Sequence, residues 1–293
     1  MSRLQNRVPS WLYALLYGGL LLGLLLIVFF PTQKISEYCK TTVEQIFPGT
    51  TCRIGSIEYE FPLTLNFGNV ELIDKQDPEE VIVSFQSLSV QADFHHRNFN
   101  IRGKLYGGDF QCRLYFKRNN GTILLTGMKA YHIDIGKWKS LHKFLGRDIS
   151  GYLDMACSYR GNLSRVLQGE AEGMATVHNG SIELLHPILS LVAIELKDSG
   201  IEFLFRNRIL TIKKGNFHGA EFNAFFNGVF HIAFPPGRSM LEISGELNPT
   251  LSLINADNRW KSIEDILRRR YGKATIRFIV NGTLAGPRFR FGG

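Results

Sequence analysis

Side chains alternate with a period of two over most of the chain after Cys52, and this pattern constrains the fold more than any other feature. In the segment IEFLFR, residues 201–206, the odd positions are all apolar and the even positions include Glu202 and Arg206. Successive side chains of a strand point to opposite faces, so this period predicts strands. Turn-forming pairs recur about every eight to twelve residues, a spacing typical of a long antiparallel meander. The sequence therefore predicts a mainly β fold with a few short helices.

Composition supports this prediction and narrows the choice of partners. The chain has 293 residues, of which 22 are Phe, an aromatic residue that strands favour. The formal net charge of +8 is compatible with nucleic acid, anionic lipid or an acidic protein as a partner. However, the Lys and Arg residues are scattered, and the densest run, Arg268 to Arg270, lies in a helical pattern typical of a solvated surface. We therefore expect no nucleic-acid partner.

The first thirty residues carry the pattern of a membrane anchor. Residues 11–30, WLYALLYGGLLLGLLLIVFF, contain no charge, and a helix of this length matches a hydrocarbon core of ~30 Å. Arg3 and Arg7 precede it, so the positive-inside rule makes residues 1–10 a cytoplasmic tail and puts the rest of the chain outside the cytoplasm. The alternative is a cleaved signal peptide. The residues FFP that close the apolar run favour an uncleaved single-pass anchor.

The remainder divides into two expected regions, 31–130 and 131–293. The first begins with a juxtamembrane helix over 33–46, which ends before a Pro-Gly pair. The second has helical patterns over 135–145 and 262–271. Residues 186–196 are compatible with either a buried strand or a short helix.

Several positions indicate how the strands turn and bend. In residues 81–94, the alternating apolar residues stand at odd positions before Gln86 and at even positions after it, and this change predicts a β-bulge. The pairs Gly107-Gly108 and Asn120-Gly121 are typical of hairpin turns, and Asn179-Gly180 predicts a further two-residue turn.

The segment 169–184, GEAEGMATVHNGSIEL, has glycines near a hydroxyl, as a phosphate-binding loop does. Its small residues alternate, however, and no helix follows directly, as a phosphate loop requires. One face carries Gly169, Ala171, Gly173 and Ala175. Small residues let a sheet bend or let a neighbour pack closely, so we expect a curved sheet here.

The sequence predicts no catalytic, metal or cofactor site. The G-x-S-x-G, H-E-x-x-H and Walker-type motifs are missing. Ser140 and Lys143 match S-x-x-K without its companion motifs. His95, His96 and His218 are interpreted as surface residues because nearby carboxylates lack a ligand spacing.

The four cysteines leave two interpretations open. Cys39, Cys52, Cys112 and Cys157 have no C-x-x-C spacing. Outside the cytoplasm, Cys39 and Cys52 could form a disulfide. Equally, all four could be small buried apolar residues.

Three segments carry a resemblance to a known family. Residues 125–184, which include ISGYLD and NGSIEL, and residues 280–291, VNGTLAGPRFRF, resemble the AsmA/TamB-like family of envelope proteins. Together with the anchor pattern and residues 61–74, FPLTLNFGNVELID, they make the whole chain similar to the type II secretion system protein N (GspN) family. These are strand-and-turn patterns and include no catalytic residue.

The resemblance implies a protein of the bacterial inner membrane with a β-rich periplasmic domain and a curved, apolar-lined sheet, the AsmA-like groove. It implies a non-enzymatic role, without cofactors, in type II secretion alongside other proteins of that system. The alternative is an envelope module that binds or transfers phospholipid. Phe203, Phe205, Phe222 and Phe226 are the expected lipid-lining residues in that alternative, unless they form an ordinary core.

Overall fold

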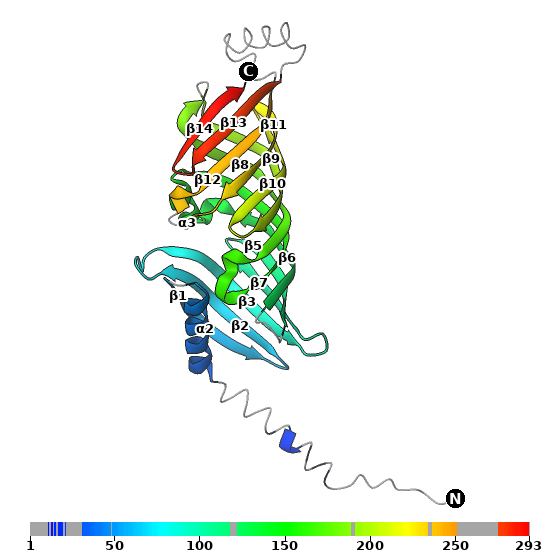
Figure 1. Cartoon of the computed structure of the whole chain (residues 1–293). Helices are drawn as coiled ribbons and strands as arrows, with labels where there is room; N and C mark the ends of the chain where they lie inside the picture. Colours follow the sequence, from blue (N-terminus) through cyan, green and yellow to red (C-terminus); the bar gives the residue numbers. More distant parts are fainter. Residues whose placement is uncertain are drawn as a thin grey trace, which may run out of the picture.

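The computed structural model describes residues 11, 13, 15, 17–19, 21, 31–47, 49–117, 122–188, 191–233, 236–250 and 275–292. Its fourteen strands form one open antiparallel sheet, in which every strand pairs with its neighbours in the chain (Figure 1). The strands are β1 (Thr50–Glu60), β2 (Thr64–Asp74), β3 (Val81–Asp93), β4 (Asn98–Leu105), β5 (Gly108–Lys117), β6 (Thr122–Asp134), β7 (Ile149–Asn162), β8 (Glu170–Ile188), β9 (Leu191–Arg206), β10 (Ile209–Gly219), β11 (Phe222–His231), β12 (Met240–Pro249), β13 (Ile276–Thr283) and β14 (Gly286–Gly292). The prediction of a mainly β, antiparallel fold is confirmed.

Helical segments are short and lie between or beside the strands. After residue 31, those in the described part of the chain are the α-helices α2 (Thr32–Ile46) and α3 (Lys139–Leu145) and the 3-10 turns η1 (Ile135–Lys137), η2 (Leu163–Gln168) and η3 (Pro236–Arg238). The helix predicted over 33–46 is confirmed as α2. The one predicted over 135–145 is divided into η1 and α3 at Trp138, and Gly146 ends it with φ 64°. The ambiguous segment 186–196 forms strand where it is described, at the end of β8 and the start of β9.

The sheet has one apolar and one polar face, because residues directly opposite in an antiparallel ladder share a face. In the middle strands, Tyr159 pairs with Ala171, Ala171 with Phe205, and Phe205 with Leu210. We call the side that bears these residues the apolar face. The polar face lies opposite and carries residues such as Glu170 and Arg206.

Helix α2 covers the apolar face at the N-terminal end of the sheet. Cys52, Phe67 and Val70 form a buried cluster there. The side chains that α2 packs against this cluster are Ile35, Cys39 and Val43. Glu44 of α2 also pairs with Lys75 at 3.0 Å, and this lowers the pKa of the Glu44 carboxyl. The amphipathic pattern of 33–46 thus serves to cover β1 to β3.

The segment between β6 and β7 crosses the apolar face to reach β3. The Nε1–H of Trp138 donates to the carbonyl oxygen of Ile82 at 2.9 Å, and the Ser140 hydroxyl donates to the same oxygen at 2.6 Å. Lys143 pairs with Glu80, and this contact raises the pKa of the Lys143 ammonium. Ser140 and Lys143, the S-x-x-K match, therefore tie α3 to β3.

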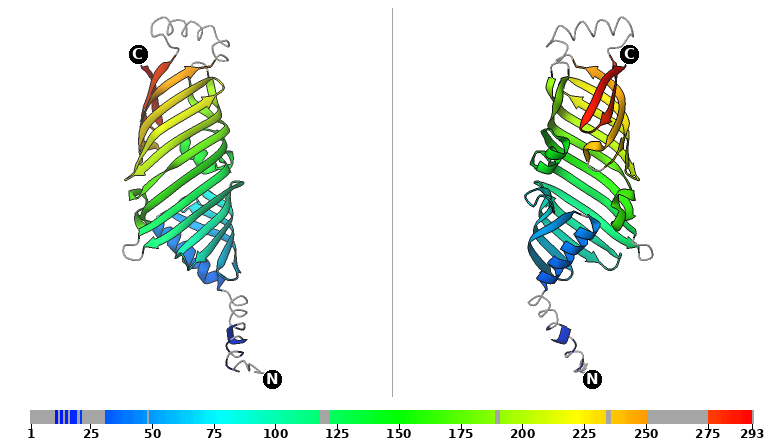
Figure 2. Two further views of the ribbon diagram at one scale, coloured as in Figure 1. Left: turned by 90° about the vertical axis from the view of Figure 1, so that its right-hand side faces the viewer. Right: turned by 60° about the vertical axis from the view of Figure 1, so that its left-hand side comes forward.

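These two sets of contacts show that the sheet curls with its apolar face inward. Helix α2 packs on β1 and also contacts η2, which follows β7, while α3 contacts β3. Through these helices, strands that are not neighbours in the sheet, such as β1 and β7, are brought near one another. This requires the sheet to be curved. Figure 2 shows the strands running obliquely along an elongated, twisted sheet.

Several strands of the curved sheet contain β-bulges. The register shifts between Phe85 and Ser87, which confirms the bulge predicted near Gln86. Strand β6 has two irregularities, at Gly127 (φ 56°) and at His132 (φ 56°). Each extra residue bends its strand and increases the local twist.

The turn predicted at Asn179-Gly180 is wrong. Strand β8 continues through this pair from Glu170 to Ile188. Asn179 adopts φ 47°, and the register to β7 shifts at Gly151, so the pair forms a bulge. The left-handed conformation that Asn favours fits a bulge as well as a turn. The long neighbours β7 and β9 provide hydrogen-bond partners on both sides, so the strand does not end here.

Other turn predictions have mixed outcomes. The hairpin predicted at Gly107-Gly108 is confirmed one residue earlier, with Tyr106 (φ 48°) and Gly107 (φ 85°) between β4 and β5. Asn120-Gly121 and the predicted helix over 262–271 lie outside the described residues. One sheet continues across the expected boundary at residue 130, which falls inside β6.

Most of the expected anchor, residues 11–30, also lies outside the described residues, and it stays a prediction. Among the described residues, no helix combines the length and apolar character needed to span a membrane.

Candidate functional site

The apolar face of β8–β14 is the strongest candidate for a binding surface. Helices α2 and α3 make their main contacts with β1 and β3, and within the described residues neither packs mainly on β8–β14. This face nevertheless keeps the apolar character of a core. Large apolar surfaces without a protein layer over them mark binding sites in soluble domains.

Phe203 and Phe205 lie on this face beside the small residues of β8. Phe203 pairs with Gly173, and Phe205 pairs with Ala171. Both rings are partly buried. A Cβ atom added to Gly173 would lie 2.4 Å from the carbonyl oxygen of Ala156 in β7, so β8 approaches β7 at a distance that only glycine permits. Close approach of a neighbouring strand, one of the two roles considered for these small residues, is therefore seen at Gly173, and large side chains of β9 lie beside the small residues of β8.

Phe222 and Phe226 lie on the same face of β11, in a cluster centred on Ala224, Leu247 and Phe278. Phe222 stacks on Phe217 with ring centroids 4.9 Å apart. A Cβ added to Gly215 would lie 2.3 Å from the Phe226 ring, which therefore lies over that glycine. Of the four predicted residues, the structure joins this pair in one cluster and places Phe203 and Phe205 on the same face, two strands away.

Three further aromatic residues of this surface are not among those predicted from the sequence. Phe278 of β13 stacks on Phe289 of β14 at 5.7 Å, and Phe291 meets Phe289 edge to face at 4.9 Å. Their alternation in RFIV and RFRF could have revealed a shared face. Their proximity to Phe222 and Phe226 depends on the order of the strands, which alternation does not contain.

One margin of this surface is basic. Arg165, Arg206, Arg208 and Arg238 lie in or next to the turns at one end of β8–β12, and all four are exposed. We call them the basic rim. The Arg208 N–H donates to the Leu167 carbonyl at 3.0 Å, and the Ile232 N–H donates to the Arg208 carbonyl at 2.8 Å, so these turns are joined along the margin. Arg206 pairs with Glu170 at 2.8 Å, whereas no ion pair in the described part of the chain involves the other three.

The polar face has two shallow depressions, of about 550 and 700 Å³. The larger one is lined by exposed Met174 and Phe225 together with charged residues of β9, β10 and β12. Phe225 is 55% exposed, although its neighbour Phe226 faces the opposite side. Within this hollow, Lys214 pairs with Glu202 at 4.0 Å, and both side chains are exposed.

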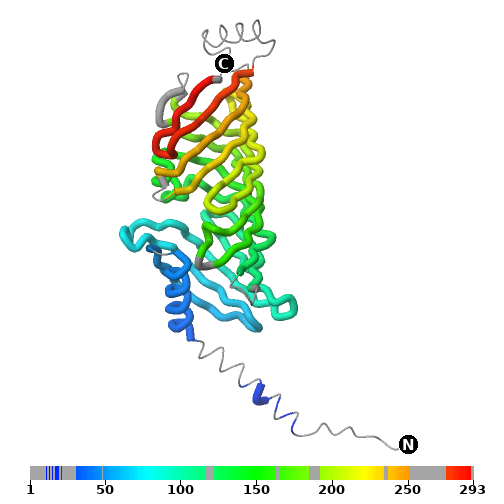
Figure 3. Tube along the Cα trace, viewed as in Figure 1, coloured from blue at the N-terminus to red at the C-terminus, as the bar shows by residue number. Residues whose placement is uncertain are grey.

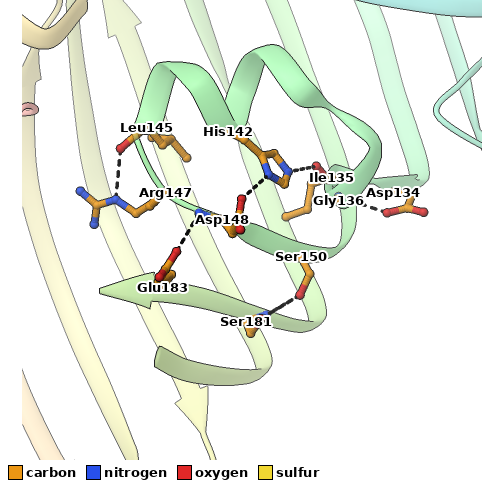
Figure 4. Close-up of polar contacts among 10 residues, drawn as sticks. All are labelled: Asp134, Ile135, Gly136, His142, Leu145, Arg147, Asp148, Ser150, Ser181 and Glu183. Atoms are coloured by element: carbon orange, nitrogen blue, oxygen red, sulfur yellow. Dashed lines mark hydrogen bonds and ion pairs between the residues drawn. The ribbon is translucent and has the colours of Figure 1, made fainter. Parts of the chain in front are cut away.

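Histidines are held by structural contacts. His142 lies between the Ile135 carbonyl, 3.1 Å from its Nε2, and Asp148 Oδ1, 3.2 Å from its Nδ1 (Figure 4). Nearby, the Asp148 N–H faces Glu183, and the Ser181 N–H donates to Ser150 at 3.1 Å, so the segment after α3 and the start of β7 are joined to β8. His178 lies between Asp154 and Asp198 on the polar face. No group of three or more His, Cys, Asp or Glu residues in the described ranges could hold a metal ion.

All four cysteines are free thiols in the structure. Cys39 and Cys52 lie in the same cluster under α2, and their disulfide stays a prediction. Burial raises the pKa of the Cys112 and Cys157 thiols to about 11 each. These two lie on β5 and β7 with β6 between them. Two strand spacings amount to roughly 9.5 Å, too far for a disulfide.

Comparisons of the chain with protein-family models, with curated proteins and with solved structures found no match.

Proposed function

We propose that this protein is a non-enzymatic envelope protein that binds phospholipid, with the acyl chains on the apolar face of β8–β14. The observation that carries the proposal is the aromatic surface of Phe203, Phe205, Phe222, Phe226 and their neighbours, over which neither α2 nor α3 makes its main contacts in the described residues. Acyl chains suit this surface because they bury apolar area and need no hydrogen-bond partners, and the Phe side chains offer none.

The basic rim supports a phosphate-bearing ligand. Arginine recognises phosphate through a fork of N–H donors, and three of the four rim arginines have no ion pair in the described part. Arg208 lies in the turn that directly follows β9, the strand that carries Phe203 and Phe205, so the rim adjoins the end of the aromatic surface. Arg206 itself points to the polar face, where it pairs with Glu170. A phospholipid lying along the face would place its headgroup at the rim and its chains on the rings.

Adjacent residues on opposite faces allow a matched test. A photoreactive phenylalanine analogue is introduced at Phe226 or at Phe225 in the full chain, expressed in bacteria and irradiated in its membranes. We expect phospholipid adducts, identified by mass spectrometry, at Phe226 and also at Phe203, and few at Phe225. The proposal fails if the folded protein gives no adduct at either inner position, or gives equal adducts at Phe225.

A second proposal follows from the resemblance and the anchor pattern. It makes the chain a single-pass inner-membrane protein, with its bulk in the periplasm, that works with other proteins of the type II secretion system. Its support is sequence resemblance, whereas the lipid proposal rests on the apolar face. Deletion of the gene should reduce export of enzymes secreted by that system. Normal export and intact secretion complexes in the deletion strain would remove this proposal and leave lipid binding standing.

A further inference from the structure

The two edge strands of the sheet are open. Strand β1 and strand β14 each have one sheet neighbour among the described residues, so each has one edge with no strand beside it in this part of the chain. They lie at the two ends of the strand series (Figure 1). Such an edge is a template for another strand.

The edge strand β14 is basic on one face and aromatic on the other. Arg288 and Arg290 are exposed on the polar face, and no ion pair in the described part involves them. Phe289 and Phe291 lie on the apolar face, and Phe291 is 44% exposed. A strand that pairs with β14 should therefore alternate acidic and apolar residues in the same period.

The other edge strand, β1, has this alternation. Glu58 and Glu60 are exposed on the polar face, where they pair with Asn66 and Thr64 of β2. Ile57 packs in the apolar cluster under α2 and shares its face with Tyr59. The charges and faces of β1 are thus complementary to those of β14.

The strand count makes the two edges compatible in direction. Neighbouring strands are antiparallel throughout, and an even number of strands leaves β14 antiparallel to β1. A second copy placed beyond β14 in the same orientation would therefore add its β1 antiparallel, with polar face beside polar face. One register sets Arg288 opposite Glu60, Phe289 opposite Tyr59 and Arg290 opposite Glu58. Pairing of two identical edges is disfavoured. If β14 of one copy paired with β14 of another, arginines would lie opposite arginines, and a β1–β1 pair would likewise place glutamates opposite glutamates.

We propose that copies of this chain associate head to tail, with β14 of one copy adding to β1 of the next and continuing the sheet. The interface is heterologous, so it forms open chains or rings and not closed two-fold dimers. Charge pairs at a surface are screened by salt, so association weakens as ionic strength rises.

Charge reversal provides a self-rescuing test. The full chain is purified in mild detergent at low salt, and its mass is measured by sedimentation over a range of concentrations. Wild type is expected to form dimers and larger species. The variants Arg288→Glu with Arg290→Glu, and Glu58→Arg with Glu60→Arg, should each remain monomeric. An equimolar mixture of the two should associate again, because each altered edge meets its complement on the other variant.

The mixture distinguishes loss of an interface from loss of folding, since two misfolded proteins would not rescue one another. The control variant Arg102→Glu with Lys129→Glu changes the charge equally at exposed positions on β4 and β6, and it should associate like wild type. A wild type that stays monomeric at every concentration overturns the proposal, and so does a mixture that fails to associate. Undiminished association of either edge variant alone also overturns it.

Discussion

At the scale of single residues, Tyr159 explains why two glycines stand near it in the sequence. Its side chain is only 8% exposed, and its hydroxyl donates to the Val166 carbonyl at 2.9 Å. A Cβ added to Gly161 or Gly169 would lie 2.0 or 2.4 Å from the Tyr159 hydroxyl oxygen. The tyrosine thus fills the space that a side chain at either position would need, and it fixes η2 against β7.

Gly169→Ala should lower the free energy of unfolding by about 1–3 kcal/mol, because the buried ring has to move. Chemical denaturation measures the change. Gly237→Ala serves as the control, since its added Cβ would meet Ala285 at an ordinary 3.4 Å. The explanation also requires that Gly169→Ala cost little in a Tyr159→Ala background, and an undiminished cost there would contradict it.

The buried thiols give a pH-dependent prediction. Because burial raises the pKa of Cys112 and Cys157 to about 11, both remain protonated near pH 8, where an ordinary thiol is partly ionised. Their alkylation by iodoacetamide in the folded protein should be more than about 100-fold slower than that of a free cysteine. Between pH 9 and 11 the unfolded chain ionises first, so these thiols also make the protein less stable as pH rises. Peptide mass spectrometry after timed alkylation gives the rates, and reaction of Cys112 at the rate of glutathione would contradict the buried placement.

At the scale of elements, the fold depends on a few segments that connect distant strands. Trp138, between η1 and α3, stacks on Tyr106 with centroids 5.6 Å apart and donates to Ile82 in β3. The Tyr106 hydroxyl in turn accepts from the Ser84 N–H, and burial raises its pKa. One indole therefore connects the β4–β5 turn, β3 and the β6–β7 connection.

Trp138→Ala should destabilise the protein by about 2–4 kcal/mol through loss of the partly buried ring. Trp138→Phe keeps an aromatic ring on Tyr106 and loses the indole N–H, which lies 2.9 Å from both the Ile82 carbonyl and the Ser140 hydroxyl, at a cost of about 0.5–1.5 kcal/mol. Urea unfolding monitored by circular dichroism gives both values. Equal losses in the two variants would show that the hydrogen bond to Ile82, and not the ring, holds this connection.

The alternation of side chains along the sequence predicts where strands lie and which residues share a face. It does not predict features that depend on the neighbouring strands, such as whether a pair of residues forms a turn or a bulge. The bulge near Gln86 is predictable because the alternating apolar residues of this strand change from odd to even positions there, and this signal lies within one strand. Asn179-Gly180 has the same local chemistry in a bulge as in a turn, and the lengths of β7 and β9 decide between them. For the candidate site, Phe222 and Phe226 stand an even number of residues apart, which is compatible with one face of a strand, whereas their cluster with Phe278 depends on the strand order.

At the scale of the whole molecule, the sheet has two parts with different support. Strands β1–β7 are held by their sheet neighbours and by α2, η1 and α3, whereas β8–β14 make their main contacts with adjacent strands within the described residues. The chain proceeds strand by strand along the sheet (Figure 3). In such a one-dimensional arrangement, stability is a sum of neighbour contacts and need not be uniform.

Hydrogen exchange should reveal this difference. Amides of β2–β6 are expected to exchange at least about tenfold more slowly than amides of β12–β14, because opening the end strands breaks fewer contacts. Exchange followed by mass spectrometry on the full chain resolves the strands. Uniform protection from β2 to β14 would show that the sheet opens as one unit.

The strict agreement between strand order and chain order has a consequence for biosynthesis. Among the described strands, each one from β2 onward pairs with the strand made just before it, so none depends on a partner made much later. A chain delivered to its compartment from the N-terminus onward can therefore assemble vectorially, one hairpin at a time, with α2 already available to cover the first strands. At every stage of this assembly, the strand made last forms the edge of the sheet. Its outer backbone N–H and C=O groups stay open to pairing with another chain until the next strand pairs with them.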